Sequence, residues 1–373
     1  MKLAFCLFNY FPHGGLQRDF ISIAKACLRQ GHEVTAITQT WEGSRPENLN
    51  VVLLPNKKFT NHGRCKRFSK QLQQYLKKNP HDIVVGFNKL PGLDVYFAAD
   101  SCYRTRAQDT HHSWYQYSAR FRTYSHLEKQ VFKSTGAPMI LALTQQQCEE
   151  YESQYQTAKS RFYLLPPGVK VARVPTTDYP IIREELRNEW VVQPHEWLLL
   201  FVGSAFKTKG LERALFAIAH LPDSLRQKIN FMVVGDGKIN TYAKLAKQLD
   251  IHDQVSFFPA RDDVWKFMLA ADLLIHPAHV ECAGKVLLEA LVAGLPVLTT
   301  DNCGYAQHIA NAQAGNVLPS PFSQRAFDLA LESMLNKEQL TTWHHHALAY
   351  ADKEDLYSLC QKTVELIESA GNL

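Results

Sequence analysis

Residues 276–297 read HPAHVECAGKVLLEALVAGLPV, and the fold assignment begins from this stretch. The apolar run at 273–276 ends at a proline, which predicts a short buried strand. Gly284 opens an apolar segment of helical length, and the Gly-Leu-Pro at 294–296 ends that segment before a second apolar run. A strand, a helix and a further strand, all apolar, are typical of a parallel sheet covered by helices.

The same alternation of short apolar runs and longer helical patterns extends along the whole chain. In the first half we expect strands at 3–8, 34–38, 51–54, 83–86, 95–99, 139–143 and 163–165, and helices at 16–30, 65–78, 114–134 and 145–155. In the second half we expect strands at 198–202, 231–235, 255–258, 273–276, 296–299 and 315–318, and helices at 210–220, 240–249, 264–271, 285–293 and 323–335. Two more helices are expected within 338–370. The sequence therefore predicts an α/β protein with two doubly wound, Rossmann-like domains facing a cleft.

A break in the pattern places the domain boundary. Pro-Pro-Gly at 166–168 is followed by polar residues up to Pro175 and Pro180, which predicts a linker. A chain of 373 residues is also long for one domain. We expect an N-terminal domain at 1–167 and a C-terminal domain at 168–354.

Composition places the chain among globular proteins, since 46% of its residues are hydrophobic and 21% are charged. The eight cysteines are dispersed, so we expect reduced thiols in a cytoplasmic protein and no zinc site. No apolar run reaches the roughly 20 residues of a membrane-spanning helix. The apolar start of the chain lacks a small-residue cleavage site, which favours a buried first strand over a signal peptide.

Positive charge is concentrated in the first half. Residues 1–168 hold 22 Lys and Arg against 12 Asp and Glu, and residues 57–134 alone hold 15 against 5. This asymmetry indicates an acidic partner such as nucleic acid, an anionic membrane or a phosphorylated acceptor. The alternative is a solvated basic face without a partner.

The segment 104–133 combines cations with aromatic residues and suits an anionic membrane interface. The aromatic residues that accompany these cations are Trp114, Tyr115, Tyr117, Phe121 and Tyr124. We expect peripheral contact with an anionic membrane, against the alternative of a surface helix whose aromatic residues are core. The histidines at 111–112 and 344–346 are expected to face solvent, because adjacent histidines on a helix point in different directions.

Two strand-to-helix turns have residues suited to a phosphate ligand. The turn at 11–19, FPHGGLQRD, has paired glycines that let backbone approach a ligand, although it does not fit the Gly-x-Gly-x-x-Gly pattern. The turn at 202–210, VGSAFKTKG, places Lys209 just before a helix start, where both the lysine and the helix end favour a phosphate. It lacks the spacing of a Walker P-loop. Both patterns also occur as plain structural turns.

Two glutamates in the 276–297 stretch need an explanation. Glu281 lies in the loop before the predicted helix, and Glu289 lies inside its apolar stretch. A carboxylate among apolar residues needs hydrogen-bond donors, and the hydroxyls of a ligand would supply them.

This pattern resembles the retaining glycosyltransferases of family 4, which have the GT-B fold. The resemblance rests on the Glu-x7-Glu spacing of Glu281 and Glu289 with Gly284 between them, followed by LEALVAGLPV at 288–297. It includes the Gly-Gly turn, the Gly203 to Gly210 turn, VGDG at 234–237 and FPAR at 258–261, and it covers essentially the whole chain.

Within the family, four stretches are similar to members that add glucose from UDP-glucose to a heptose of the lipopolysaccharide inner core. They are FPHGGLQRDF at 11–20, VGFNKLPGLDVYFAAD at 85–100, PPG at 166–168 and DNCGYAQHI at 301–309. The resemblance implies a hexosyltransferase at the cytoplasmic face of the inner membrane, with UDP-sugar and lipopolysaccharide core as ligands. It implies that no metal or cofactor is required, that no nucleic acid is bound, and that a helix at about 355–373 packs back on the first domain.

The resemblance also assigns roles to residues. The implied catalytic residues are Asp100, Glu281 and Lys209, and the implied donor-binding residues are Gly15, Asp19, Arg173, Lys209, Arg261, Gly284, Lys285, Val286 and Glu289. Glu281 is expected near the transferred glucose, Glu289 at the ribose hydroxyls, and Asp100 at the β-face of the sugar. Lys209, Arg173 and the amides of Lys285 and Val286 are expected to neutralise the diphosphate. Gly15 leaves room beside that diphosphate, and Arg261 borders the uracil.

The chain departs from the family pattern where many members have an arginine, at Ser204 or Thr208. Lys207 and Lys285 are candidates to replace that cation. Three other functions stay open at this level: another UDP-sugar-dependent family 4 transferase, a nucleotide-sugar epimerase, and a non-catalytic nucleic-acid-binding protein that uses the basic segment. No RNA- or DNA-binding signature supports the last of these.

Overall fold

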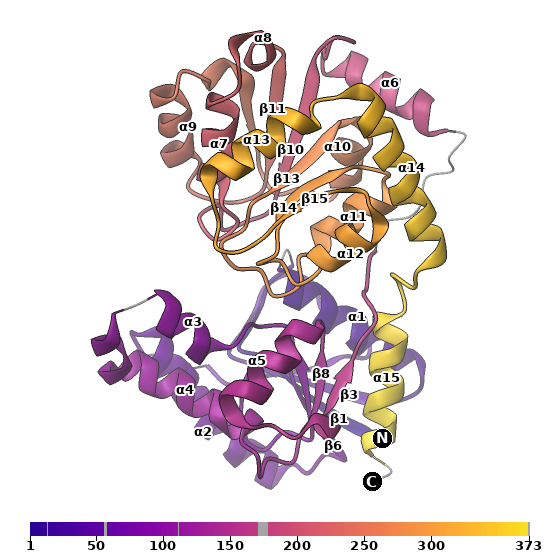
Figure 1. Cartoon of the computed structure of the whole chain (residues 1–373). Coiled ribbons are helices and arrows are strands. Elements are labelled where there is room, and N and C mark those ends of the chain that lie inside the picture. The colour runs from indigo at the N-terminus through magenta and orange to yellow at the C-terminus, as the bar shows by residue number, and fades with distance from the viewer. Residues whose placement is uncertain (13, 56–57, 111, 171–177, 372–373) are drawn as a thin grey trace. The chain divides into compact units, whose positions relative to one another are not determined.

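The computed structural model describes residues 1–12, 14–55, 58–110, 112–170 and 178–371. The chain divides into two compact units (Figure 1). Unit 1 is Met1–Pro167 together with Tyr357–Leu373, and unit 2 is Gly168–Leu356. Unit 2 is therefore inserted between two parts of unit 1.

Unit 1 is built on a seven-stranded parallel sheet of order β5-β3-β1-β6-β7-β8-β9. Its strands are β1 Lys2–Cys6, β3 Glu33–Thr38, β5 Asn50–Leu53, β6 Ile83–Gly86, β7 Val95–Ala98, β8 Met139–Ala142 and β9 Phe162–Leu164. A small separate pair joins β2 Asn9–Tyr10 to β4 Thr40–Trp41. The helices are α1 Gly15–Arg29, α2 Asn61–Lys78, α3 Tyr103–Thr110, α4 Ala119–Phe132, α5 Gln145–Tyr155 and α15 Leu359–Ala370, with 3₁₀ turns η1 Ser113–Tyr117 and η2 Lys159–Arg161. Helix α15 packs on α1.

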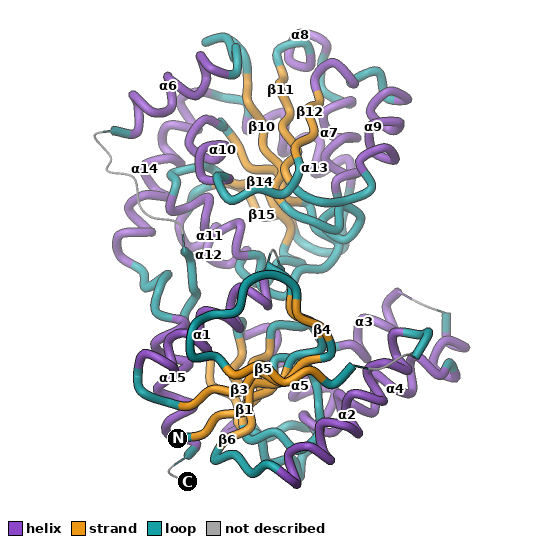
Figure 2. The backbone as a smooth tube through the Cα atoms, turned by 180° about the vertical axis from the view of Figure 1, so that it is seen from behind, coloured by secondary structure: helices purple, strands orange, loops and turns teal. Residues whose placement is uncertain are grey.

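Unit 2 has a six-stranded parallel sheet of order β12-β11-β10-β13-β14-β15 (Figure 2). Its strands are β10 Trp197–Val202, β11 Ile229–Val234, β12 Val255–Phe258, β13 Leu273–His276, β14 Val297–Thr300 and β15 Gly315–Leu318. The helices are α6 Tyr179–Glu189, α7 Leu211–Ala219, α8 Asp223–Arg226, α9 Ile239–Gln248, α10 Val264–Ala270, α11 Lys285–Val292, α12 Ala306–Ala312, α13 Gln324–Met334 and α14 Lys337–Lys353, with a 3₁₀ turn η3 His252–Gln254.

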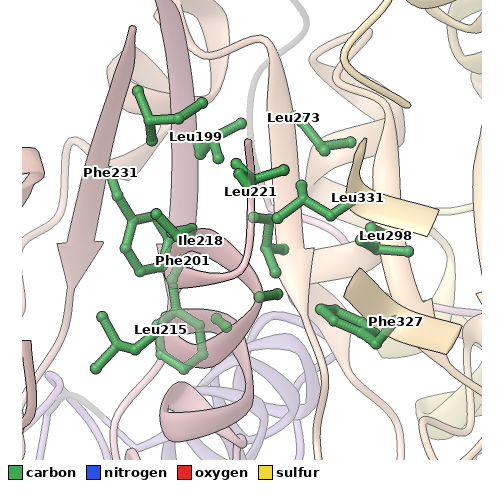
Figure 3. Packing of buried hydrophobic residues seen from close by; sticks show 14 of the residues in the cluster. Leu199, Phe201, Leu215, Ile218, Leu221, Phe231, Leu273, Leu298, Phe327 and Leu331 are labelled. Atoms are coloured by element: carbon green, nitrogen blue, oxygen red, sulfur yellow. The ribbon is translucent and has the colours of Figure 1, made fainter. Parts of the chain in front are cut away.

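Burial explains why the strands read as unbroken apolar runs. Strand β10 is WLLLFV, and its first five side chains are buried because helices cover both faces of the sheet. In the core of unit 2, Phe201 and Phe231 from neighbouring strands pack with Leu215 and Ile218 of α7 (Figure 3). The predicted fold class, two Rossmann-like α/β domains, is confirmed for each unit.

Several predicted elements differ from the structure. The single helix predicted at 114–134 is the turn η1 followed by α4, because the Ser118 hydroxyl accepts a hydrogen bond from the Phe121 amide and starts a new helix there. Helix α3, which precedes that stretch, was not predicted. Helix α6 was not predicted; it begins at the end of the predicted linker and has Pro180 in its first turn, where proline is tolerated. Helix α12 was not predicted, because its sequence AQHIANA has no strong apolar period.

Histidines on α14 also differ from the expectation of solvent exposure. His344 is half-buried, and its Nδ1 lies 2.7 Å from the carbonyl oxygen of Gly294. His346 is half-buried too, with Nδ1 2.9 Å from the carbonyl oxygen of Gln313. His345 is exposed. The hydrogen bonds of His344 and His346 attach α14 to the turns that follow α11 and α12.

No helix among the described residues is both apolar enough and long enough to cross a membrane.

Candidate active site

The site in unit 2 lies where the strand order of its sheet reverses. Strands β10 and β13 are neighbours in the sheet. From β10 the chain continues to β11 on one side, and from β13 it continues to β14 on the other. The loops at the carboxyl ends of two such strands border a crevice that takes ligands in open α/β sheets. These loops are residues 203–210 after β10 and 277–284 after β13.

Hydrogen bonds and close packing hold the two loops together. The His279 amide donates to the Thr208 carbonyl oxygen at 2.9 Å. The Arg213 guanidinium donates to the carbonyl oxygen of Pro277 at 3.2 Å. Gly210 has φ of +73°, and a Cβ at this position would collide with the Pro277 carbonyl oxygen. Only glycine permits this close approach of the two loops.

The result is that Lys209 and Glu281 form an ion pair between the loops. Their side chains keep 22% and 16% of their accessible surface, so the pair is shielded but reachable. Burial lowers the pKa of Lys209. Glu281 is fixed by its backbone, since its amide donates to the Asn302 carbonyl oxygen at 3.0 Å and its carbonyl accepts from the Gly304 amide at 3.1 Å.

His276 lies beside Glu281 of this ion pair and was not predicted as a site residue. It is fully buried at the end of β13, and its Nε2 lies 3.6 Å from Glu281 Oε2. Neither ring nitrogen has a hydrogen-bond partner among the described residues. Burial, reinforced by the charge of Lys209, lowers the pKa of His276 to about 3, so the imidazole is neutral. The sequence signal was a histidine ending an apolar strand just before the loop that carries Glu281.

Helix α11 begins immediately after this loop. Gly284 precedes it in the left-handed conformation at φ +83°, and no side chain caps the helix start. The first turn of the helix also holds no acidic residue. Lys285 and Val286 are the first two helical residues, both half-buried, and Glu289 follows four residues after Lys285 on the same side of the helix. Glu289 is half-buried, not enclosed by the apolar helix as its neighbours suggested.

Arg261 lies apart from this group, in the connection between β12 and α10. It is exposed, and its Nη2 donates to Asp263 Oδ2 at 2.7 Å. Its guanidinium also lies 4.9 Å from the ring centre of Phe267. This connection leaves the same edge of the unit 2 sheet as the other two loops, but no contact joins Arg261 to Lys209 or Glu281.

The loop after β10 holds Ser204, where many family members have an arginine, and Lys207, one of the two candidates to replace it; the other candidate, Lys285, begins α11. Ser204 is exposed, and its hydroxyl accepts from the Asp236 amide at 3.3 Å. Lys207 is exposed in the same loop as Lys209. Arg173 lies outside the described residues.

In unit 1 the predicted residues lie in α1 and just beyond β7. Gly15 is the first residue of α1 and is exposed, with open space where a Cβ would point. Asp19 is buried one turn later. Asp100 is exposed just beyond β7, and its carbonyl oxygen accepts hydrogen bonds from Gln147 at 2.8 Å and Tyr151 at 3.0 Å. These two bonds fix the backbone that presents the carboxylate.

Metal ligands are a separate question. Within the part of the chain that the structure describes, no three His, Cys, Asp or Glu side chains are grouped so that they could hold a metal ion.

Comparison with protein families defines the class. Residues 13–173 match the model "Glycosyltransferase Family 4", and residues 182–354 match "Glycosyl transferases group 1". Each unit thus matches one half of a two-domain sugar transferase. The protein is a glycosyltransferase enzyme.

Individual relatives narrow the assignment. The chain is 44% identical over 368 residues to the lipopolysaccharide glucosyltransferase WaaG of Escherichia coli K12, with 98% of each chain covered. The crystal structure of WaaG superposes with a TM-score of 0.93 at 43% identity, over 98% of this chain and 99% of that one. Anabaena HepE in complex with UDP-glucose shares the fold, with a TM-score of 0.73 at 17% identity over 99% of this chain and 100% of that one. The chain belongs to the family 4 glycosyltransferases with the GT-B fold, which confirms the resemblance seen in the sequence.

Proposed function

We propose that the protein is a retaining glucosyltransferase that moves glucose from UDP-glucose to a heptose of the lipopolysaccharide inner core. The relative that supports this acceptor is the lipopolysaccharide glucosyltransferase WaaG, which matches along almost the entire chain. The observation that carries the donor side is the Lys209–Glu281 pair beside the uncapped start of α11.

The chemistry of the transfer explains why such a site is useful. Breaking the bond between glucose and UDP leaves negative charge on the diphosphate and positive character on the sugar. Lys209, Lys285 and the positive end of α11 stabilise the leaving diphosphate. A charge-assisted hydrogen bond is worth about 1.5–3 kcal/mol and a helix end about 0.3–2 kcal/mol. With the implied Arg173, these groups supply roughly 5–8 kcal/mol where they act mainly on the transition state.

The carboxylates have separate roles in this proposal. Glu281 binds hydroxyls of the transferred glucose and holds Lys209 in position until the diphosphate arrives. Glu289 binds the ribose hydroxyls from the next turn of α11. From the family resemblance, the proposal assigns Asp100 to the β-face of the sugar, Gly15 and Asp19 to donor binding, and Arg261 to the uracil. Because charged side chains and a helix end serve the diphosphate, we expect transfer to need no added metal.

The acceptor is lipid-linked, so we propose peripheral contact with the cytoplasmic face of the inner membrane through residues 104–133. Trp114 and Tyr117 in η1 are 68% and 72% exposed, as a membrane contact requires. The other aromatic residues of this segment partly fit the alternative, since Tyr115 and Phe121 pack around Tyr103 in a half-buried cluster.

The deciding experiment measures donor binding and transfer side by side. UDP-glucose, UDP-galactose and UDP-N-acetylglucosamine are each added while heat denaturation is followed, and UDP-glucose should raise the Tm most, since a ligand at 100 times its Kd stabilises by about 2.7 kcal/mol. Transfer to lipopolysaccharide that lacks core glucose is then measured with and without EDTA, and should be equal in both.

Three results would contradict the proposal. Equal protection by all three sugars would remove the donor assignment. Consumption of the UDP-sugar without an acceptor would indicate an epimerase. Loss of transfer in EDTA that Mg²⁺ or Mn²⁺ restores would contradict the metal-free mechanism.

A further inference from the structure

All charged residues of helix α2 in unit 1 are basic, and none of them belongs to the proposed donor site. Its 18 residues hold six cations and no acidic residue. All six are exposed: Arg64, Lys66, Arg67, Lys70, Lys77 and Lys78. Within the described residues, no ion pair involves Lys66, Arg67 or Lys70.

The helical period gathers these cations on one side. Cys65, Phe68, Ser69 and Leu72 are the buried residues that face the core. Lys66, Lys70 and Lys77 follow one another at intervals of four and seven residues, so they lie along the opposite face. A membrane or other anionic surface approaching from solvent would meet this row directly.

Helix stability does not account for this arrangement. Cations are favourable near the C-terminus of a helix, which fits Lys77 and Lys78, but Arg64, Lys66 and Arg67 lie in its N-terminal half, where they oppose the helix dipole. Lys66 and Lys70 are also like charges four residues apart, a spacing at which they repel. Ordinary helical surfaces mix charges of both signs.

An exposed aromatic residue precedes the helix. Phe59 is fully exposed, next to Thr60, whose hydroxyl accepts from the Gly63 amide and caps α2. Water-facing phenyl rings beside rows of cations are typical of protein surfaces that enter a lipid interface.

Helix α2 also adjoins the segment already proposed to contact membrane. Helix α2 packs on α4 (Figures 1 and 2). On the core side of α2, Cys65 Sγ lies 4.0 Å from the Tyr124 hydroxyl. Helix α4 follows η1, which exposes Trp114 and Tyr117.

We infer that Phe59 and the basic face of α2 form a second membrane-contact element, which binds the anionic headgroups of a bilayer. This inference rests on the proposed membrane contact of residues 104–133 and extends it to a helix outside that segment. Each Lys or Arg near an anionic membrane strengthens binding several-fold at physiological salt, so α2 supplies affinity while exposed aromatic side chains enter the interface.

The test uses the full-length chain and vesicles of phosphatidylcholine with or without about one third phosphatidylglycerol. The α2 variant is Lys66→Gln/Arg67→Gln/Lys70→Gln. Its control, Lys228→Gln/Lys244→Gln/Lys247→Gln, removes the same charge from exposed lysines of unit 2. Phe59→Ser probes the aromatic residue, and Trp114→Ser/Tyr117→Ser probes the neighbouring segment. Heat protection by UDP-glucose is measured on every variant as a readout of folding and donor binding.

We expect the α2 variant to partition onto anionic vesicles at least about 20-fold more weakly than the control variant, with a smaller dependence on salt. Phe59→Ser should also weaken binding, and UDP-glucose protection should be unchanged throughout. If the α2 variant binds as well as wild type while Trp114→Ser/Tyr117→Ser loses binding, the inference is overturned and the proposed membrane contact remains intact. Wild-type protein that ignores anionic vesicles, or binds single-stranded RNA in their place, would overturn both.

Discussion

At the scale of single residues, the Lys209–Glu281 pair carries the most consequence for activity. We expect Lys209→Ala and Glu281→Ala each to lower kcat/KM at least about tenfold, equal to about 1.4 kcal/mol of transition-state stabilisation. The double variant should lose less than the sum of the two, because the residues contact each other. Steady-state kinetics with the exposed Lys244→Ala as control measure this. Near-normal transfer by both single variants would remove the proposed site.

His276 makes a prediction about pH. The unfolded imidazole takes up a proton below about pH 6.5, whereas the folded one, with its pKa lowered to about 3, does not. The unfolded state therefore binds more protons between those values, and the free energy of unfolding falls as the pH decreases through that range. Between pH 7.5 and pH 5 this one group should remove about 2 kcal/mol.

Urea unfolding of wild type and His276→Leu at both pH values tests this. The variant's own stability at pH 7.5 is not the readout. What matters is the loss on going to pH 5, which should be smaller in the variant by about that amount. An identical loss in both proteins would show that His276 does not titrate as its burial requires.

At the scale of elements, Gly284 links the catalytic loop to α11. An alanine at this position would have to keep φ at +83°, at a cost of about 1–2 kcal/mol, and its Cβ would lie 3.1 Å from Glu281 Cγ. We expect Gly284→Ala to lower both Tm and kcat/KM. Gly31→Ala is the matched control, because φ there is +82° but no atom lies within 4 Å. The control should share the loss of Tm and keep its activity; equal activity losses would contradict a role in positioning Glu281.

The elements also show what the sequence could and could not reveal. Buried parallel strands appear in the sequence as unbroken apolar runs, so the bounds of β10 and β13 were predictable almost to the residue. Helix α6 was not, because it is held by ion pairs of Arg183 and Arg187 with Asp272, which lies far along the chain. Likewise, no local pattern brings Lys209 to Glu281. That contact follows from the adjacency of β10 and β13, which only the sheet order defines. His276 was overlooked because it ends an apolar strand, and no local pattern shows that its ring is buried beside Glu281.

At the scale of the whole molecule, α15 is the part of unit 1 that comes last in the chain. It buries Leu359, Val364 and Ile367, and His32 Nε2 lies 2.8 Å from Glu368 Oε1. A chain that ends at Leu356 should therefore lose the cooperative unfolding of unit 1 while unit 2 keeps its UDP-glucose protection. Limited proteolysis read by mass spectrometry would show cleavage confined to residues 1–167. Unchanged resistance of that region would contradict the assignment of α15 to unit 1.

The insertion of unit 2 within unit 1 also orders events at the ribosome. Everything in Gly168–Leu356 must be translated before α15 exists. At about 5–20 residues per second, the nascent N-terminal sheet waits on the order of ten to forty seconds for its last helix. During that interval the surface of α1 that receives α15 is uncovered, so the growing chain exposes at a defined stage of its synthesis a surface that the folded unit buries.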